Sequence, residues 1–128
     1  MDEDLAASGD GQAYPALGVA HRRVDRLVVI TVTGEVDAVT APHLSAAIDE
    51  ATAGSSAGVI VDLSDVHFLA SAGLGVLITT HDQMAPSARF GVVADGPATR
   101  RPITVLGLDD IITLYRTLED AVADMGDA

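Results

Sequence analysis

Apolar and β-branched residues predict five strands along the chain. Residues 26–33 contain the run LVVITV, which is apolar on both faces, as in a central strand of a sheet. Residues 18–24 form another strand just before it, and Asp25 marks a tight turn between the two. Shorter apolar runs at residues 58–63, 89–94 and 110–115 predict three more strands.

Between the strands, the spacing of apolar residues becomes helical. From Leu44 to Ala51 it follows i, i+3, i+4 and i+7, which predicts a helix on one side of a core. Thr40 is its expected cap, and Pro42 falls in its first turn, where a missing backbone N–H costs nothing. A second helix is predicted over residues 71–84 by the same criterion.

The last third of the chain predicts two more helices. One covers residues 97–106, although a proline inside it removes a backbone donor, and Gly107 ends it. The other runs to about Met125 and is capped by Thr117, with Asp120 three residues further on.

This order of elements predicts a single α/β domain. Two strands followed by helix and strand alternation give a small mixed, largely parallel β-sheet packed against crossover helices. At 128 residues the chain has the length of one domain, which we expect over residues 17–125, between a flexible N-terminal tail at 1–16 and a frayed end at 126–128. The predicted core is Val28, Ile30, Val32, Leu44, Ile48, Ile60, Val61, Leu77, Ile78 and Val92.

Charge narrows the classes of partner. The chain has 7 basic and 19 acidic residues, a net charge of −12, and every basic residue is an arginine. Such a chain repels nucleic-acid backbones and anionic lipid headgroups, so we expect neither a nucleic-acid nor a membrane partner. The acidic N-terminus lacks a signal sequence, and the most apolar window, residues 68–78, is too short to span a bilayer. We therefore expect a soluble cytoplasmic protein.

The sequence lacks residues that the common enzymatic and cofactor-binding motifs need. A phosphate-binding loop of the Gly-Lys type needs lysine, which this chain lacks, and Ile78 occupies the third glycine position of a dinucleotide fingerprint that would begin at Gly73. The chain has no cysteine, and its four histidines, His21, His43, His67 and His81, do not pair at metal-ligand spacing. We expect no cofactor, no metal and no catalytic residue.

Ser71 stands at a strand-to-helix junction and has several interpretations. Its hydroxyl could simply cap the helix, or it could be a site that tolerates phosphate, because the positive end of the helix dipole lies beside it. A nucleophile elbow is the weakest interpretation, since Leu69 occupies a position where that motif needs glycine, and His67 is the only base near in sequence.

Two motifs occur in a specific order: GEVDAVTAP at residues 34–42 and VIVDLSDVHFLASAGLG at residues 59–75. Together with GLD at residues 107–109 they resemble the STAS domain of anti-sigma factor antagonists, the anti-anti-sigma factors of bacteria. The resemblance covers about residues 17 to 125.

This resemblance implies partner switching by a regulatory module that is not an enzyme. An unphosphorylated antagonist binds an anti-sigma factor, often a serine kinase, and so releases a sigma factor for transcription. Phosphorylation blocks that binding and a phosphatase restores it. The family's phosphoacceptor falls on Ser71, although Ala70 replaces a usual aspartate and Ala72 a usual serine or threonine.

The resemblance also suggests where a partner binds. Asp37 is either a turn residue or a member, with Ser71, of one partner surface. The full set expected at that surface is Asp37, Ala70, Ser71, Ala72, Gly73, Gly75, Val76 and Thr79, with Gln83 at its border. Because of Ala70 and Ala72, a STAS module that works without phosphate, as a ligand sensor or a scaffold subunit, is the alternative.

Overall fold

The computed structural model describes residues 16–54, 56–85 and 87–126, and it contains one five-stranded sheet. Residues 1–15 of the tail predicted at 1–16, and the last two residues, lie outside the described part of the chain. The strands follow in the order β1 (Leu17–Val24), β2 (Leu27–Val36), β3 (Gly58–Leu69), β4 (Arg89–Val93) and β5 (Thr113–Tyr115). β1 is antiparallel to β2 and the other neighbours are parallel, which confirms the mixed, largely parallel sheet.

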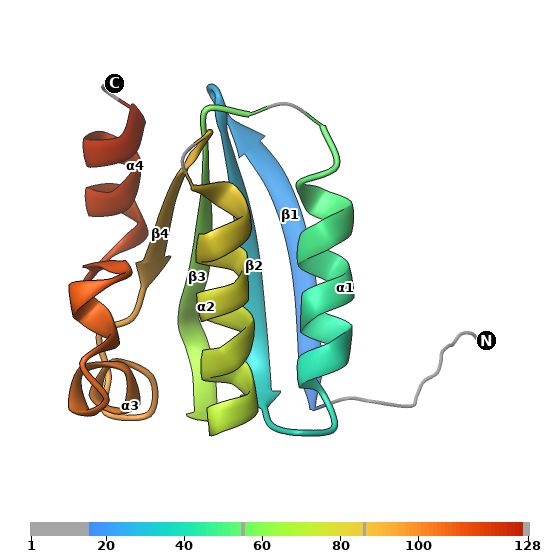
Figure 1. The fold of residues 1–128 in the computed structure, drawn as a ribbon, viewed down its shortest axis with the longest axis vertical. Coiled ribbons are helices and arrows are strands. Elements are labelled where there is room, and N and C mark those ends of the chain that lie inside the picture. The colour runs from blue at the N-terminus through green and yellow to red at the C-terminus, as the bar shows by residue number, and fades with distance from the viewer. Residues whose placement is uncertain (1–15, 55, 86, 127–128) are drawn as a thin grey trace.

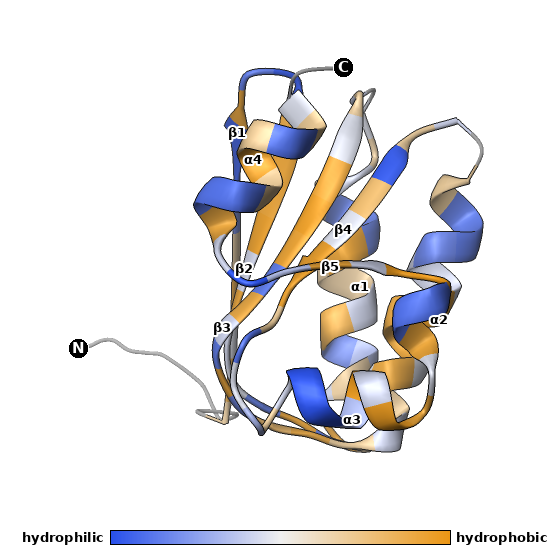
Figure 2. Ribbon diagram, turned by 90° about the vertical axis from the view of Figure 1, so that its left-hand side faces the viewer, coloured by the Kyte–Doolittle hydropathy of each residue, from blue (hydrophilic) through white to orange (hydrophobic). Residues whose placement is uncertain are grey.

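Helices cover both faces of this sheet unequally. They are α1 (Ala41–Ala51), α2 (Ser71–Met84), α3 (Arg100–Val105) and α4 (Leu118–Gly126), with a 3₁₀ turn, η1, at Leu108–Asp110. α1 and α2 lie side by side on one face (Figure 1), and α4 lies on the other (Figure 2). In the described residues no helix is long and apolar enough to cross a membrane.

The apolar run in β2 is explained by the two layers of helices. Val28, Ile30 and Val32 face the cluster that includes α1 and α2, whereas Leu27 and Val29 pack in the cluster beneath α4. Nine of the ten predicted core residues are buried; Ile78 is the exception, being partly buried at the edge of the larger cluster.

β3 is longer than predicted. The sequence indicated a strand over residues 58–63 and a loop to Ala70, but β3 continues to Leu69. Its pairing with β2 contains two register shifts, between Thr31 and Thr33 and between Gly34 and Glu35. At each shift β3 contains one residue more than β2. The regular alternation of inward and outward side chains is therefore lost, and the sequence of this segment does not show the pattern of a strand.

Several boundaries in the last third also move. The predicted helix at residues 97–106 shrinks to α3, and the segment before it is a turn in which the carbonyl of Gly96 accepts the N–H groups of Thr99 and Arg100. The predicted strand at 110–115 is confirmed only over its second half, as β5, because Asp110 still belongs to η1. Gly126, placed in the frayed end, is the last residue of α4. The cap at Thr117 is confirmed, since its hydroxyl accepts the N–H of Asp120 at 3.0 Å.

Candidate functional site

The two sequence motifs meet at the carboxyl ends of β2 and β3. The N–H of Ala70 donates to the carbonyl of Val36 at 2.8 Å, directly after the last paired residues of the two strands. Asp37 follows Val36 and Ser71 follows Ala70, so the turn before α1 and the start of α2 lie at the same end of the sheet (Figure 1). The parallel pairing of β2 and β3, followed by this hydrogen bond, therefore brings residues 34 positions apart in sequence to the same end of the sheet.

Asp37 organises the turn that leads into α1. Its Oδ1 accepts the N–H groups of Val39 and Thr40, both at 2.9 Å. The Thr40 hydroxyl lies 3.2 Å from the same oxygen and donates to the carbonyl of Glu35 at 2.9 Å, instead of capping the helix. These hydrogen bonds, led by that from the Thr40 backbone, favour the charged carboxylate and hold the pKa of Asp37 below its ordinary value.

The interpretation of Asp37 as a turn residue is thus confirmed, and it does not exclude a second role. The contacts within the turn all use Oδ1, and the side chain is only half-buried. The turn also holds Val39 at the surface, where 57% of the residue is exposed.

Ser71 is not the cap of α2, which corrects the sequence prediction. Ala70 occupies the N-cap position with extended backbone (ψ 173°), and no side chain caps this helix. β3 ends at Leu69 and only Ala70 separates it from α2, so Ser71 is the first helical residue and the position before it serves as the cap. It is exposed, and within the described part of the chain its hydroxyl makes no hydrogen bond.

The start of α2 leaves polar backbone groups available. The N–H groups of Gly73 and Leu74 donate to the carbonyl of Ala70, at 2.9 and 3.2 Å. Those of Ser71 and Ala72 precede them in the first turn, where the N–H groups of a helix have no partner inside it. With no acidic side chain in that turn, the positive end of the helix dipole is not neutralised locally.

The two glycines of the second motif have different surroundings. A Cβ built on Gly73 would lie 2.6 Å from both Leu69 Cδ1 and Val36 Cγ1, so the absence of a side chain lets α2 pack closely on the ends of the strands. Gly73 is therefore buried and holds the helix in place. A Cβ on Gly75 would meet nothing within 4 Å, and the residue is exposed.

The other predicted partner residues divide between surface and core edge. Thr79 is exposed and lies one turn beyond Gly75, itself one turn beyond Ser71, which makes an exposed stripe of small residues along α2. Ala70, Ala72 and Val76 are partly buried, and Gln83 at the border is exposed.

One large apolar residue at this end escaped the sequence analysis. Phe68 is 50% exposed in β3, where it pairs with Glu35 of β2. The sequence analysis placed it in a loop and gave it no role, whereas the structure places it in β3 just after the second register shift. Beside it, His67 Nε2 lies 3.8 Å from Glu35 Oε2.

The hydrolase interpretation of Ser71 gains no support. His67 contacts Glu35, and among the described residues no hydrogen bond joins it to Ser71. Among the same residues, no group of three or more His, Cys, Asp or Glu side chains could hold a metal ion.

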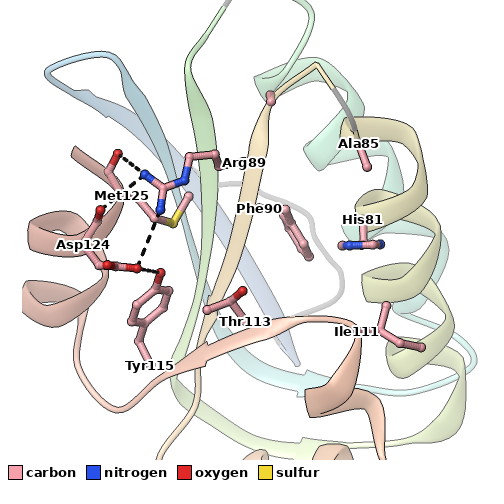
Figure 3. Close-up of a pocket in the computed structure, with 10 residues that line it drawn as sticks. His81, Ala85, Arg89, Phe90, Ile111, Thr113, Tyr115, Asp124 and Met125 are labelled. Atoms are coloured by element: carbon pink, nitrogen blue, oxygen red, sulfur yellow. Dashed lines mark hydrogen bonds and ion pairs between the residues drawn. The ribbon is translucent and has the colours of Figure 1, made fainter. Parts of the chain in front are cut away.

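A cavity of about 270 Å³ lies at the edge of the sheet formed by β4 and β5 (Figure 3). The polar residues that line it form hydrogen bonds with one another and with the end of α4. Arg89 Nη1 donates to the carbonyls of Asp124 and Met125 at 3.3 and 3.1 Å, which fixes the end of α4 to the sheet. The Tyr115 hydroxyl donates to the Asp124 carboxylate, and burial together with this hydrogen bond raises the pKa of Tyr115 to about 12. We interpret this cluster as structural, because its polar groups satisfy one another.

Comparisons with known proteins agree with the motifs. A family model of the STAS domain matches residues 19–121. The anti-sigma-F factor antagonist RsfB of Mycobacterium tuberculosis is 44% identical over 96 residues, which are 75% of this chain and 79% of RsfB. These relatives are named as regulatory antagonists and not as enzymes, in agreement with the prediction of a non-enzymatic module.

Solved structures show the same fold. The crystal structure of an anti-sigma factor antagonist from Mycobacterium paratuberculosis is 43% identical and has a TM-score of 0.85 over 90% of this chain and 99% of its own. The Bacillus cell fate determinant SpoIIAA in its phosphorylated form has a TM-score of 0.62 at 24% identity, over 84% of this chain and 98% of its own. At that identity the second likeness concerns the fold alone.

Proposed function

The chain belongs to the STAS domain family, and from that membership we propose that it is an anti-sigma factor antagonist controlled by phosphorylation of Ser71. In this proposal the unphosphorylated protein binds an anti-sigma factor that is also a serine kinase, in the cytoplasm, and a sigma factor is released. A phosphatase returns the phosphorylated form to the active pool.

The observation that carries the proposal is the exposed, unused hydroxyl of Ser71. A kinase must reach the side chain that it modifies, and Ser71 is exposed at the first position of α2. Its hydroxyl contributes no hydrogen bond to the described structure, so phosphorylation would break none. A phosphate at the amino end of a helix is favoured by the dipole, typically by about 0.3–1 kcal/mol at an exposed position.

The proposed partner surface is the stripe of Ser71, Gly75 and Thr79 together with the turn at Asp37. Gly75 supports this assignment in an independent way. Glycine inside a helix costs about 0.5–1 kcal/mol relative to alanine, and the surroundings of Gly75 within the chain give no reason for that cost. A residue without a side chain at an exposed position allows a partner to approach the helix backbone closely.

Phosphate would act against binding at this surface. It adds about 1.5–2 negative charges at neutral pH, and a close interface must remove the water around them. Since the first turn of α2 has no basic side chain nearby in sequence to neutralise the new charge, the cost falls on the contact with the partner.

Binding of the purified anti-sigma factor to three variants tests the proposal. Ser71→Ala should bind like the wild type but accept no phosphate from the kinase and ATP. Ser71→Glu should fold yet bind at least about tenfold more weakly, which corresponds to a loss of 1.4 kcal/mol. Ser87→Glu is the matched control, because Ser87 is exposed beyond the far end of α2.

The alternative function is a STAS module that works without phosphate. It is favoured by Ala70 and Ala72, which replace the polar residues that usually flank the phosphoacceptor in the family. Equal affinity of Ser71→Glu and wild type for the anti-sigma factor, or no transfer of phosphate to Ser71 by the kinase, would support that module and contradict the switch.

A further inference from the structure

A buried hydroxyl without a partner lies directly before α3. In the described part of the chain three polar residues are buried, and two of them, Thr40 and Thr80, donate their hydroxyls to the carbonyls of Glu35 and Val76. The third, Thr99, is only 3% exposed. It occupies the N-cap position of α3, but its side chain does not cap the helix, and its hydroxyl makes no hydrogen bond to any described residue. Burying a hydroxyl in this way costs free energy, so its position calls for an explanation.

Thr99 lines a cavity of about 400 Å³, which we call the Thr99 cavity. Ser64 and Val66 of β3 form one side of it, and residues 95–98, in the loop from β4 to α3, form the other. This loop leads into α3 at the end of the sheet where β2 and β3 end (Figure 1). Ligands of sheets with parallel strands bind outside the carboxyl ends of the strands, in pockets of about 300–1,000 Å³. The Thr99 cavity has both the place and the size of such a pocket.

The cavity has an apolar interior and a charged mouth. Val66 and Thr99 are buried and form its inner part, whereas Asp95 and Arg116, which also line it, are exposed. Arg116 follows the last residue of β5 directly. A ligand would therefore meet opposite charges first and a single hydroxyl between apolar walls further in.

Other polar side chains of the lining have contacts within the protein. The Ser64 hydroxyl donates to Asp62 Oδ1 at 2.6 Å, and His67 Nε2 lies 3.8 Å from Glu35 Oε2. The groups that remain for a ligand are the Thr99 hydroxyl and the two charges at the mouth.

The two charges form a pair that can accept a further molecule. Arg116 Nη1 donates to Asp95 Oδ1 at 2.6 Å, and the two side chains are 65% and 60% exposed. An ion pair so exposed to water contributes little to stability. A guanidinium group has five N–H donors and a carboxylate has two acceptor oxygens, so each partner can bind one more group while the pair stays intact.

A ligand that uses both charges must itself carry both signs. Its carboxylate would accept hydrogen bonds from Arg116, and its ammonium group would donate to Asp95. A ligand with negative charge alone would be repelled by Asp95 and by the net charge of −12, and one with positive charge alone would be repelled by Arg116. We propose that the Thr99 cavity binds a small zwitterion, an α-amino acid whose short polar side chain reaches the Thr99 hydroxyl.

NMR titration of the purified protein with serine, asparagine and glutamine tests the proposal. Backbone amide signals of Val66, Arg116 and residues 95–99 should shift, and the shifts should saturate at micromolar to millimolar concentrations of at least one of the three amino acids. The acetylated form of that amino acid lacks the ammonium group, and the amidated form lacks the carboxylate. Each of these two forms should bind at least about tenfold more weakly than the free amino acid.

Thr99→Val removes the hydroxyl and nearly keeps the shape of the side chain. The variant should bind the amino acid at least about tenfold more weakly. It should also unfold at a higher urea concentration than the wild type, because the buried hydroxyl that it removes has no partner in the protein. Thr104→Val is the matched control, since Thr104 is exposed in the same helix, donates to the carbonyl of Arg101 at 3.2 Å and lies outside the lining of the cavity. It should leave the affinity unchanged.

Arg116→Gln tests the orientation of the ligand. It should weaken binding of the free amino acid and remove the preference for that form over the amidated one, which a loss of folding alone would not do. Circular dichroism establishes that each variant is folded.

Four outcomes would overturn the proposal. They are the absence of shifts with all three amino acids at millimolar concentration, equal binding of the free and the singly charged forms, unchanged affinity of Thr99→Val, and a lower urea midpoint of Thr99→Val, which would show that the hydroxyl has a structural partner such as a bound water. The proposed function is tested separately on the Ser71 variants, because the Thr99 cavity shares no lining residue with the proposed partner surface.

Discussion

Alanine at Gly73 and at Gly75 should have opposite effects on stability, although the two glycines lie two residues apart in α2. At Gly75 the added methyl group meets nothing within 4 Å, so only the helix propensity changes. Gly75→Ala should raise the free energy of unfolding by about 0.5–1 kcal/mol. At Gly73 the same methyl group would overlap Leu69 Cδ1 and Val36 Cγ1, each at 2.6 Å.

The difference between the two variants isolates the packing effect. Both glycines lie inside one helix, so the gain in helix propensity largely cancels between them. What remains is the overpacking at Gly73, which typically costs about 1–3 kcal/mol. The β-branched Val36 has little freedom to move aside, and its Cβ lies only 3.3 Å from the Cβ that alanine would add at position 73. We therefore expect a cost above the low end of this range.

Urea unfolding followed by circular dichroism measures both free energies. Gly73→Ala should unfold at a lower urea concentration than the wild type and Gly75→Ala at a higher one, with unchanged m-values. Thermal midpoints should separate in the same order, by roughly 4 °C for each kcal/mol in a domain of this size. Equal midpoints for the two variants would show that α2 does not rest on Val36 and Leu69 as described, and would refute the reasoning.

Three further predictions concern residues that hold the fold. In a Tyr14→Phe background, absorbance at 295 nm should show Tyr115 ionising near pH 12. Because its pKa is raised on folding, its contribution to stability is complete below the ordinary value near 10 and is lost as pH rises through 12. A titration midpoint near 10 would contradict this. Asp37→Ala should lower the urea midpoint at pH 7. The difference between the midpoints of wild type and variant should narrow in acid, because the lowered pKa of Asp37 gives stability that is lost as pH falls through the folded-state value. A difference independent of pH would contradict this prediction. Gly34→Ala should cost more than about 2 kcal/mol in urea unfolding, because its φ is +97° and the new Cβ would lie 1.9 Å from the carbonyl oxygen of Ala16, whereas a near-neutral result would exclude that packing.

Regular elements with strong local signals could be predicted from the sequence alone. α2 begins and ends where its apolar spacing indicated, at Ser71 and Met84, and the turn at Asp25 has the positive φ that a tight hairpin needs. The two-sided apolar pattern of β2 correctly identified a central strand, because helices pack on both faces of the sheet.

The end of β3 could not be predicted, and the segment before Ser71 was taken for a loop. Extra residues in β3 relative to β2 are tolerated because hydrogen bonding resumes after each shift, a property of two strands together that neither sequence shows separately. Phe68 lies just after the second shift and is exposed, and Ala70, not Ser71, occupies the N-cap position of α2. Ser71→Ala should consequently change stability by less than about 0.5 kcal/mol, where a capping serine would cost about 1.

The exposed apolar residues at the end of α3, Val105 and Leu106, were missed for a different reason. Apolar spacing identifies the residues that a helix can bury, but it assumes that a core exists on that side along the whole helix. α3 has only six residues, and Ile103 is the one that is buried. Val105 and Leu106 extend the apolar pattern beyond the end of that contact, so the sequence cannot distinguish them from core residues.

A switch at Ser71 would have to act through the surface and not through a rearrangement of the fold. Its neighbours in the chain are fixed by interactions that do not involve its side chain: the backbone bond from Ala70 to Val36 on one side, and the close packing of Gly73 on the other. A ligand or modification changes a conformation only by as much as it interacts differently with the two states, and the hydroxyl of Ser71 has no hydrogen bond to a described residue that it could lose. Phosphorylation should therefore leave α2 and the Asp37 turn in place and change only the charge and shape that a partner meets. NMR chemical shifts that change upon phosphorylation should be confined to the start of α2 and the adjoining turn, and large changes in β4 or α4 would contradict this rigid form of the switch.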